Sequence, residues 1–198
     1  MNSLEAKPQA DWSHLDEANN PAMVDVSAKA FSRRTATAMA EMWLPPEIAS
    51  RLIEGEIQAP KGPVFHTAII AGTMAAKQTS SLIPFCHPLP LEGIHISIQA
   101  RNGGLLEITA EAKVTYKTGV EMEALTAATV AALTVYDMCK VFSHAMEIRN
   151  VRLVDKHGGK SDYRANARSL RFLDCCWREG AAPAWGTTRP RWSSARMA

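Results

Sequence analysis

The strongest constraint on the fold is the stretch Thr115–Lys140, which reads TYKTGVEMEALTAATVAALTVYDMCK. Its first two residues are the last two of LLEITAEAKVTY, a run in which apolar and polar residues alternate. A period of two is typical of a strand with one buried face. After a turn at residues 117–119, the stretch continues as a run rich in Ala, Thr and Val, which predicts a long helix. A strand and a long helix of small residues are therefore joined here, and the rest of the chain is arranged around them.

The expected helix carries carboxylates at both ends of one face. Thr118 followed three residues later by Glu121 is a capping-box pattern, so the helix is expected to begin there. A period of 3.6 residues places the following side chains on one stripe: Glu123, Thr126, Ala127, Val130, Thr134 and Asp137. Lys140 lies one turn beyond Asp137. Charges at the ends of a stripe of small residues either need buried partners or line a site.

Hydrophobic periodicity predicts the other elements. In order, they are a strand through residues 35–42, a helix at 46–55 that is opened by Pro46 and stopped by Gly55, an apolar strand at 64–72, a short helix at 73–83, strands at 94–100 and 105–116, the long helix, and a strand at 148–154. From Val64 to Val154 this is the β-α-β-β-α-β order of a ferredoxin-like α+β fold, with an N-terminal strand and helix added in front. The two helices are expected to cover one face of an antiparallel sheet, which leaves the other face to the N-terminal segment or to another subunit.

Composition divides the chain into three parts. Residues 1–22 are expected to form a flexible lead-in, residues 23–164 a single catalytic domain, and residues 165–198 a disordered tail of abruptly different composition. From Arg164 onward, seven Arg stand against two acidic residues, a balance of +5; the whole chain carries +2, so the residues before Arg164 carry −3. The basic character therefore belongs to the tail and does not indicate a nucleic-acid-binding domain.

Cysteine usage and hydropathy predict a cytoplasmic protein. The four cysteines show neither C-x-x-C nor metal-ligand spacing, which favours reduced thiols. The N-terminus lacks the apolar region of a signal peptide, and no apolar run approaches the ~18–20 residues of a membrane span.

Cationic side chains gather in the predicted loops and at the ends of elements. Lys61 lies in a loop bounded by Pro and Gly, and Lys156 and Lys160 flank a double glycine whose backbone amides suit phosphate oxygens. Together with Lys77, Lys140 and an Arg of the Arg33-Arg34 pair, these residues suit a substrate with several phosphates. The acidic residues Glu121, Glu123 and Asp137 add capacity for proton transfer.

Each of these residues also has an ordinary structural interpretation. A single Lys61, Lys77 or Lys160 is most often a solvated surface charge, and Glu121 could simply complete the capping box. Asp137 and Lys140 could form an i,i+3 helix pair worth only ~0.2–0.5 kcal/mol. His87, held between Cys86 and a proline, could be structural, and Cys86 and Cys139 could be small buried hydrophobes. Taken alone, the residues predict only an anion-binding α+β domain that could be an enzyme.

Four stretches resemble a known family. MVDVSAKA, KGPVFHTAIIAGTMAAKQTSSLIPFCHPLPLEG, KTGVEMEALTAATVAALTVYDMCK and DKHGGKSDYR are similar to molybdenum cofactor biosynthesis protein C, the family of cyclic pyranopterin monophosphate synthases. The resemblance covers about Met23 to Arg164. It implies a phosphorus–oxygen lyase that rearranges a 3′,8-cyclised dihydro-GTP, delivered by a radical-SAM enzyme, to a tricyclic pyranopterin with loss of diphosphate. It also implies ferredoxin-like subunits that form dimers and then a hexamer with sites at subunit interfaces. No cofactor is required, although Mg²⁺ could accompany the triphosphate.

The resemblance also implies roles for individual residues. Asp137 and Lys140 in YDMCK are expected to be the catalytic pair, with Lys61 and Lys156 as further catalytic lysines. The residues expected to bind the substrate are Arg34, Lys77, Cys86, His87, Pro88, Leu89, Glu121, Met122, Glu123 and Lys160. No residue is expected to bind a metal. We expect Lys61 or Lys140 to act as general acid or base, oriented by Asp137, with a pKa lowered by the neighbouring cations. The run GGKSDYR lacks a glycine that the family often has after the serine, which leaves Asp162 and Tyr163 without a role.

Two functions other than this enzyme are alternatives for a chain of this predicted fold. Ferredoxin-like sheets also occur in RNA-binding domains, but those need aromatic residues on the central strands, and the two strands at 94–116 offer only Tyr116. A non-catalytic nucleotide sensor would carry the same residues as the enzyme. Turnover of the cyclised GTP separates the sensor from the enzyme.

Overall fold

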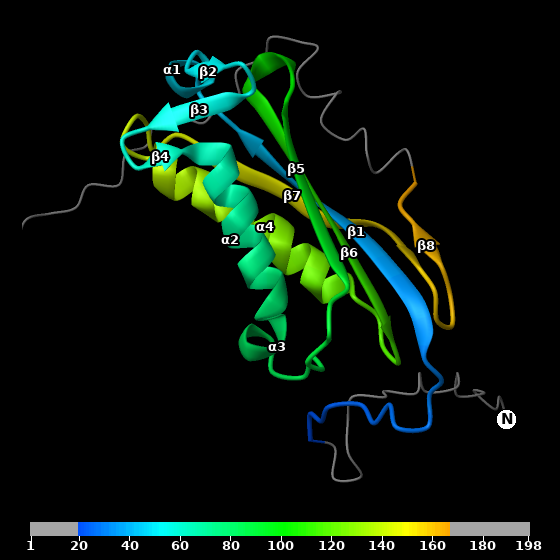
Figure 1. Cartoon of the computed structure of the whole chain (residues 1–198). Coiled ribbons are helices and arrows are strands. Elements are labelled where there is room, and N and C mark those ends of the chain that lie inside the picture. Colours follow the sequence, from blue (N-terminus) through cyan, green and yellow to red (C-terminus); the bar gives the residue numbers. More distant parts are fainter. Residues whose placement is uncertain (1–19, 167–198) are drawn as a thin grey trace, which may run out of the picture. The chain divides into compact units, whose positions relative to one another are not determined.

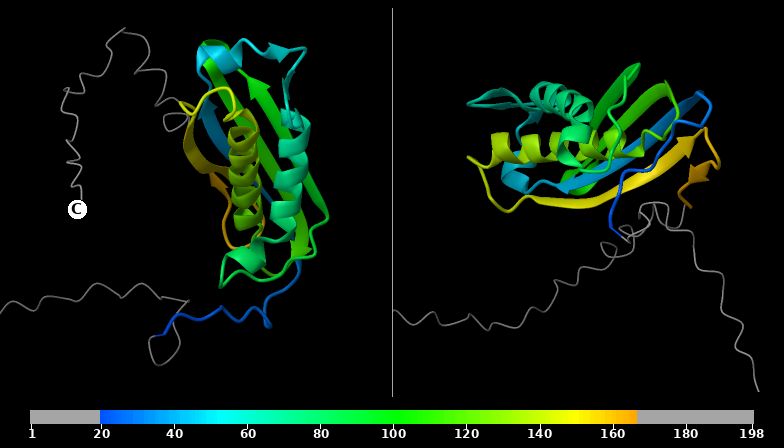
Figure 2. Two further views of the ribbon diagram at one scale, coloured as in Figure 1. Left: turned by 90° about the vertical axis from the view of Figure 1, so that its left-hand side faces the viewer. Right: turned by 90° about the horizontal axis from the view of Figure 1, so that it is seen from below.

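The fold is built on a five-stranded antiparallel sheet with two long helices on one face. A computed structural model describes residues 20–166 and gives the strand order β5-β6-β1-β7-β8 (Figure 1). The strands are β1 (Ser32–Trp43), β5 (Gly93–Ala100), β6 (Leu105–Tyr116), β7 (Glu147–His157) and β8 (Tyr163–Arg164). Helices α2 (Val64–Lys77) and α4 (Glu121–Cys139) lie side by side across the same face (Figure 2). The predicted α+β class is confirmed.

Smaller elements complete the described residues. Between β1 and α2 the chain forms the short helix α1 (Pro46–Ala49) and a second sheet of the strands β2 (Leu52–Ile53), β3 (Glu56–Ala59) and β4 (Gly62–Pro63). A one-turn helix α3 (Thr79–Leu82) follows α2, and a 3-10 turn η1 (Asn102–Gly104) joins β5 to β6. No helix within residues 20–166 is both long and apolar enough to cross a membrane. Most of the predicted lead-in and tail lies outside these residues, so the three-part division of the chain stays a prediction.

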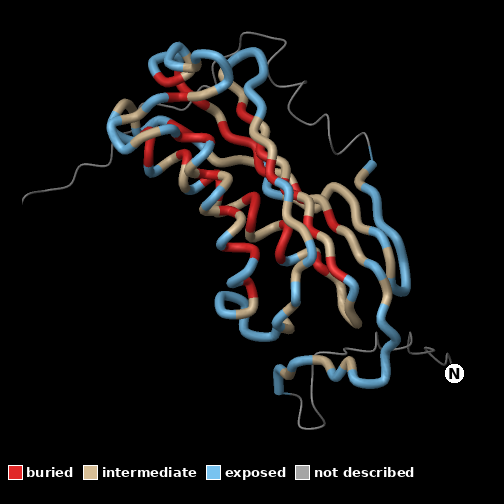
Figure 3. Tube along the Cα trace, in the orientation of Figure 1, coloured by how far each residue is buried: buried red, intermediate tan, exposed pale blue. Residues whose placement is uncertain are grey.

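The core lies between the central strands and α4, and it is made largely of alanine. Ala36, Ala38 and Ala40 of β1 pair with inward residues of β6 and are fully buried, as the alternating pattern predicts. The facing residues of α4 are also small: Ala124, Ala127, Ala128, Ala131 and Ala132. Buried residues accordingly run along the sheet and along the inner side of both helices (Figure 3). Small side chains on both surfaces let the helix approach the sheet closely.

Gly72 of α2 packs closely against α4 and β5. A Cβ atom there would lie 2.7 Å from the carbonyl oxygen of Ala127 and 2.7 Å from Cδ1 of Ile96. We therefore expect Gly72→Ala to lower the free energy of unfolding by about 1–3 kcal/mol, the usual cost of overpacking, as measured by urea unfolding. Gly93→Ala is the matched control, because its Cβ would meet only Lys113 atoms at 3.9 Å. A Gly72→Ala protein as stable as the Gly93→Ala protein would contradict this packing.

The strand predicted at residues 64–72 is wrong, because these residues begin helix α2. Its buried positions recur at helical spacing: Val64, Phe65, Ala68, Gly72, Ala75 and Ala76. A short apolar run with a β-branched and an aromatic residue looks the same in a buried strand and in a buried helix. Strand β1 takes the place of the missing strand, so that β1-α2-β5-β6-α4-β7 supplies the β-α-β-β-α-β order. The N-terminal strand thus lies between β6 and β7 and is not an addition in front of the sheet.

Two predicted helix boundaries are also wrong. The helix that begins at Pro46 ends at Ala49, because Glu54 and Gly55 adopt positive φ of 50° and 81° and turn the chain between β2 and β3. Helix α4 begins at Glu121 with Val120 as its N-cap residue and no side-chain cap bond, so the capping box at Thr118 is not formed.

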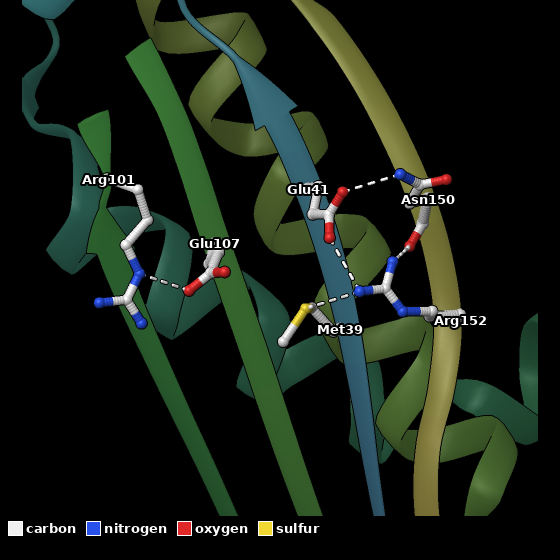
Figure 4. Close-up of polar contacts among 6 residues, drawn as sticks. All are labelled: Met39, Glu41, Arg101, Glu107, Asn150 and Arg152. Atoms are coloured by element: carbon white, nitrogen blue, oxygen red, sulfur yellow. Dashed lines mark hydrogen bonds and ion pairs between the residues drawn. The ribbon is translucent and has the colours of Figure 1, made fainter. Parts of the chain in front are cut away.

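The sheet face opposite the helices is polar. Glu41 of β1 is only 5% exposed, and its carboxylate accepts hydrogen bonds of 2.8 Å from Arg152 and from Asn150 of β7 (Figure 4). Arg101 and Glu107 form a second ion pair of 2.6 Å. Glu41 and its two partners, Asn150 and Arg152, lie where the pairing of β1 with β7 shifts register. A partner that covered this face would therefore meet charged groups that are already paired within the subunit.

Candidate active site

Three of the four predicted catalytic residues meet at the C-terminal end of α4. Asp137 lies in the last turn of the helix, and Lys61 extends from the turn between β3 and β4. The Asp137 carboxylate binds Lys61 Nζ at 2.6 Å through Oδ2 and Lys140 Nζ at 2.8 Å through Oδ1. We call these three residues the aspartate–lysine cluster. All three side chains are about half exposed, beside a cavity of about 330 Å³ that Met138 and His144 also line.

The cluster fixes the charge of its members. Hydrogen bonds from Lys140 and Lys61 lower the pKa of Asp137 to about 2, so this carboxylate is ionised at any working pH. The same bond from Asp137 raises the pKa of Lys140. The predicted lowering of the lysine pKa is therefore wrong for Lys140, because the hydrogen bond and the charge of Asp137 outweigh desolvation. Lys140 is therefore protonated at neutral pH.

A second group of predicted residues gathers at the N-terminal end of α4, around a cavity of about 270 Å³. Six of the predicted substrate-binding residues line it: Cys86, His87, Leu89, Glu121, Met122 and Glu123. We call this cavity the helix-start pocket. His87 Nε2 lies 2.9 Å from the carbonyl oxygen of Val24, and because a carbonyl only accepts, Nε2 carries the hydrogen. Burial, followed by the charge of Glu123, raises the pKa of the Cys86 thiol, which keeps it neutral.

Cations flank the helix-start pocket. Lys156 Nζ binds Glu121 Oε1 at 3.0 Å. The Arg34 guanidinium donates to the carbonyl oxygens of Tyr116 at 3.1 Å and Lys117 at 3.3 Å. It also packs against the loop between Lys156 and Lys160, which we call the glycine loop. A Cβ on Gly159 of this loop would lie 2.2 Å from Arg34 Nη1.

Asp162 holds the glycine loop in place. Its Oδ1 accepts a 2.9 Å hydrogen bond from the N–H of Gly158, which, together with His157, lowers the pKa of Asp162. The loop between Lys156 and Lys160 is thereby closed on itself. No role for Asp162 could be assigned from the sequence, and its structural role becomes visible only in the folded loop.

Residues 23–159 match the sequence model of the MoaC family. The chain belongs to the MoaC family. It is 50% identical over 156 residues to a cyclic pyranopterin monophosphate synthase of Xanthomonas oryzae, an alignment that covers 79% of this chain and 94% of that protein. A protein of the same name from Desulfitobacterium hafniense is 50% identical over 77% of this chain and 93% of its own length. A Synechocystis protein named molybdenum cofactor biosynthesis bifunctional protein is 50% identical over 76% of this chain and 45% of its own length.

In this MoaC-family chain, five predicted residues line neither the helix-start pocket nor the cavity beside the aspartate–lysine cluster. Lys77, Pro88 and Lys160 are exposed, whereas Arg34 and Lys156 are half-buried beside the helix-start pocket. Conversely, Val24, Val26 and Lys29 line the helix-start pocket and were not predicted. The motif MVDVSAKA is the sequence feature that could have identified these three residues. It contributes to the resemblance but carries no obvious catalytic side chain except Lys29.

Helix α4 keeps the two groups apart. It spans 19 residues, which at about 1.5 Å per residue amounts to roughly 28 Å. The aspartate–lysine cluster lies at its end and the helix-start pocket at its beginning. The predicted stripe does not form a continuous exposed surface between them, because its members Glu123 and Ala127 are buried whereas Asp137 is exposed. Within one subunit the two groups therefore lie at opposite ends of α4.

Glu123 should make stability depend on pH. Burial raises the pKa of this carboxyl from 4.5 to about 7. Both states are protonated below pH 4.5. Between about pH 4.5 and 7 the unfolded chain ionises first, so the free energy of unfolding falls as pH rises, by a total on the order of 3 kcal/mol. Glu123→Gln should lack this fall in urea unfolding followed from pH 4 to 8, whereas the exposed control Glu47→Gln should retain it. Parallel curves for wild type and Glu123→Gln would contradict the raised pKa.

Proposed function

We propose that this chain is a cyclic pyranopterin monophosphate synthase. It converts (8S)-3′,8-cyclo-7,8-dihydroguanosine 5′-triphosphate to cyclic pyranopterin monophosphate and diphosphate in molybdenum cofactor biosynthesis. The observation that carries the proposal is the aspartate–lysine cluster, in a chain that is half identical to proteins of this name over nearly their whole length. Opening the imidazole-derived ring and reclosing it as a pyrazine requires repeated proton transfers, which positioned acids and bases provide.

In this proposal the residues of the aspartate–lysine cluster have separate roles. Lys140, whose pKa is raised, is the general acid, and the ionised Asp137 orients both lysines. Lys61 neutralises charge as a hydroxyl oxygen attacks the α-phosphorus and diphosphate leaves. Glu121 and Glu123, which line the helix-start pocket, hold the ring end of the substrate. The remaining cations bind the triphosphate: Arg34, Lys77, Lys156 and Lys160, together with His87.

We further propose that each active site combines two subunits. The separation of the two groups by the length of α4 supports this, since a single substrate then needs one group from each of two copies. The strand order β5-β6-β1-β7, antiparallel throughout, supports the ferredoxin-like assignment that goes with dimers and a hexamer. The substrate would come from a radical-SAM enzyme.

The proposal includes no redox cofactor. It also includes a cytoplasmic location, and the free thiols of Cys86 and Cys139 support that location. No group of three or more His, Cys, Asp or Glu side chains suited to a metal occurs within the described part of the chain. Any Mg²⁺ would therefore be held mainly by the triphosphate oxygens of the substrate.

The deciding experiment is turnover of the cyclised GTP by the purified chain. We expect equal amounts of pyranopterin product and diphosphate. Chromatography measures the pyranopterin, and a diphosphate assay measures the diphosphate. Tight binding of the substrate without product would instead make the chain a nucleotide sensor. The same assay, run with and without a chelator, tests whether Mg²⁺ takes part.

A further inference from the structure

Glu56 is a partly buried carboxylate outside both groups of candidate site residues. It is the first residue of β3, and its side chain is only 13% exposed. Its Oε1 accepts hydrogen bonds from the N–H groups of Ile57 at 2.8 Å and Phe65 at 2.7 Å. Its Oε2 accepts from the N–H of His66 at 3.1 Å and lies 2.6 Å from His66 Nδ1. One carboxylate thus binds both the start of β3 and the start of α2.

These contacts supply a cap that α2 otherwise lacks. The N-cap residue of α2 is Pro63, whose side chain makes no cap bond and which has the extended φ and ψ of −68° and 123°. Phe65 and His66 are the second and third residues of the helix, whose N–H groups an N-cap side chain normally binds. Burial alone would raise the pKa of Glu56, but the hydrogen bonds from Phe65, His66 and Ile57 outweigh it and lower the pKa. Glu56 therefore caps the helix as a charged acceptor from seven residues before the N-cap position.

The segment that Glu56 closes carries Lys61 at its tip. Strands β3 and β4 pair through only Gln58 with Pro63 and Ala59 with Gly62, and a hairpin this short is marginal by itself. The Lys61 side chain is more than half exposed, so its approach to Asp137 depends on where the hairpin backbone lies. The bond from Glu56 to the first turn of α2 ties the base of that hairpin to the helix that packs against α4.

We propose that Glu56 is a positioning residue for Lys61, because its carboxylate caps α2 and fixes the hairpin that presents Lys61 to Asp137. This inference rests on the proposed function for its effect on catalysis. Its structural part, the coupling of the α2 cap to the Lys61–Asp137 pair, stands on the contacts of Glu56 alone.

Glu56→Ala tests the proposal, and Pro63→Asp offers a rescue. Glu56→Ala is expected to lower kcat roughly 10- to 100-fold with little change in KM, because a displaced catalytic group costs most in the chemical step. The double variant Glu56→Ala/Pro63→Asp places a local cap on a residue that already has N-cap geometry, and it should recover most of the lost kcat. Pro63→Asp alone sets the reference rate. Glu54→Gln, in the exposed turn before β3, is the matched control and should keep the wild-type kcat.

Two further readouts do not need turnover. Amide hydrogen exchange at Phe65 and His66 should speed up in Glu56→Ala and slow again in the double variant. The rate at which an amine-reactive ester labels Lys61, measured by peptide mass spectrometry, should likewise rise in Glu56→Ala and fall again in the double variant. A lysine released from Asp137 reacts faster. If Glu56→Ala does not fold, Glu56→Gln keeps the volume and one acceptor oxygen and should show the same changes to a smaller degree.

The outcomes separate this inference from the proposed function. A wild-type protein that makes no pyranopterin defeats the proposed function, while the exchange and labelling results still decide the coupling. An active wild type whose Glu56→Ala variant keeps full kcat overturns the role of Glu56. A double variant with a protected first turn of α2 but unrecovered kcat also overturns it, because Glu56 would then act by some means other than the cap.

Discussion

Asp137→Asn is expected to lower kcat by about 10²–10⁴-fold, the range that positioned acid–base groups contribute. The substitution keeps the shape of the side chain but removes the charge that holds Lys61 at 2.6 Å and Lys140 at 2.8 Å. The two lysines then repel each other, and the upward shift that Asp137 gives to the pKa of Lys140 is lost. Single-turnover kinetics with the cyclised GTP measures the effect on the chemical step.

The pH profile distinguishes this role from a simple loss of binding. If Lys140 is the general acid, its deprotonation sets the alkaline limb of the kcat profile, and that limb should move to lower pH in Asp137→Asn. The acid limb should not report Asp137 in the wild type, because a carboxyl with a pKa of about 2 stays ionised across the accessible range. Glu47→Gln, an exposed carboxylate on α1, should leave both limbs in place. A wild-type kcat in Asp137→Asn would remove Asp137 from the catalytic machinery.

Much of the sheet could be predicted from the sequence because its strands have one buried face. The alternation in β1 and β6 reflects a physical constraint, so the residues expected to point inward are those that are buried. Helix α2 was mistaken for a strand because its first turn, Val64 and Phe65, favours strands by composition, and only the longer spacing of its buried residues reveals the helix. The hairpin of β2 and β3 was missed because it depends on two residues with positive φ, Glu54 and Gly55, of which only glycine gives a warning in the sequence.

The candidate site was predictable in its residues but not in its arrangement. Asp137 and Lys140 are three residues apart on a helix, so their contact follows from the sequence, whereas the approach of Lys61 to Asp137 depends on tertiary structure. The division of the predicted residues between the two ends of α4 follows from the antiparallel packing of α2 and α4, which no local pattern specifies. The pKa of Lys140 was predicted to shift in the wrong direction because crowding by cations was given more weight than the contact of Lys140 with Asp137.

The length of α4 leads to the second large expected effect, which is recovery of activity from two inactive variants. Asp137→Asn damages the aspartate–lysine cluster, and Lys156→Ala damages the cationic side of the helix-start pocket. If each site takes one group from each of two subunits, a mixed pair holds one intact site and one site with both defects. Random pairing makes half of the pairs mixed, so the mixture should regain about a quarter of the wild-type kcat per subunit. Co-expression with two different tags and purification on both would isolate the mixed oligomers.

A matched mixture provides the control for shared sites. Asp137→Asn with Lys140→Ala places both defects in the same cluster, so every site of a mixed pair contains one of them and no activity should return. Recovery in the first mixture but not in the second would show that the two ends of α4 serve different active sites within one oligomer. No recovery in either mixture, from oligomers shown by native mass spectrometry to contain both variants, would mean that one subunit supplies the whole site.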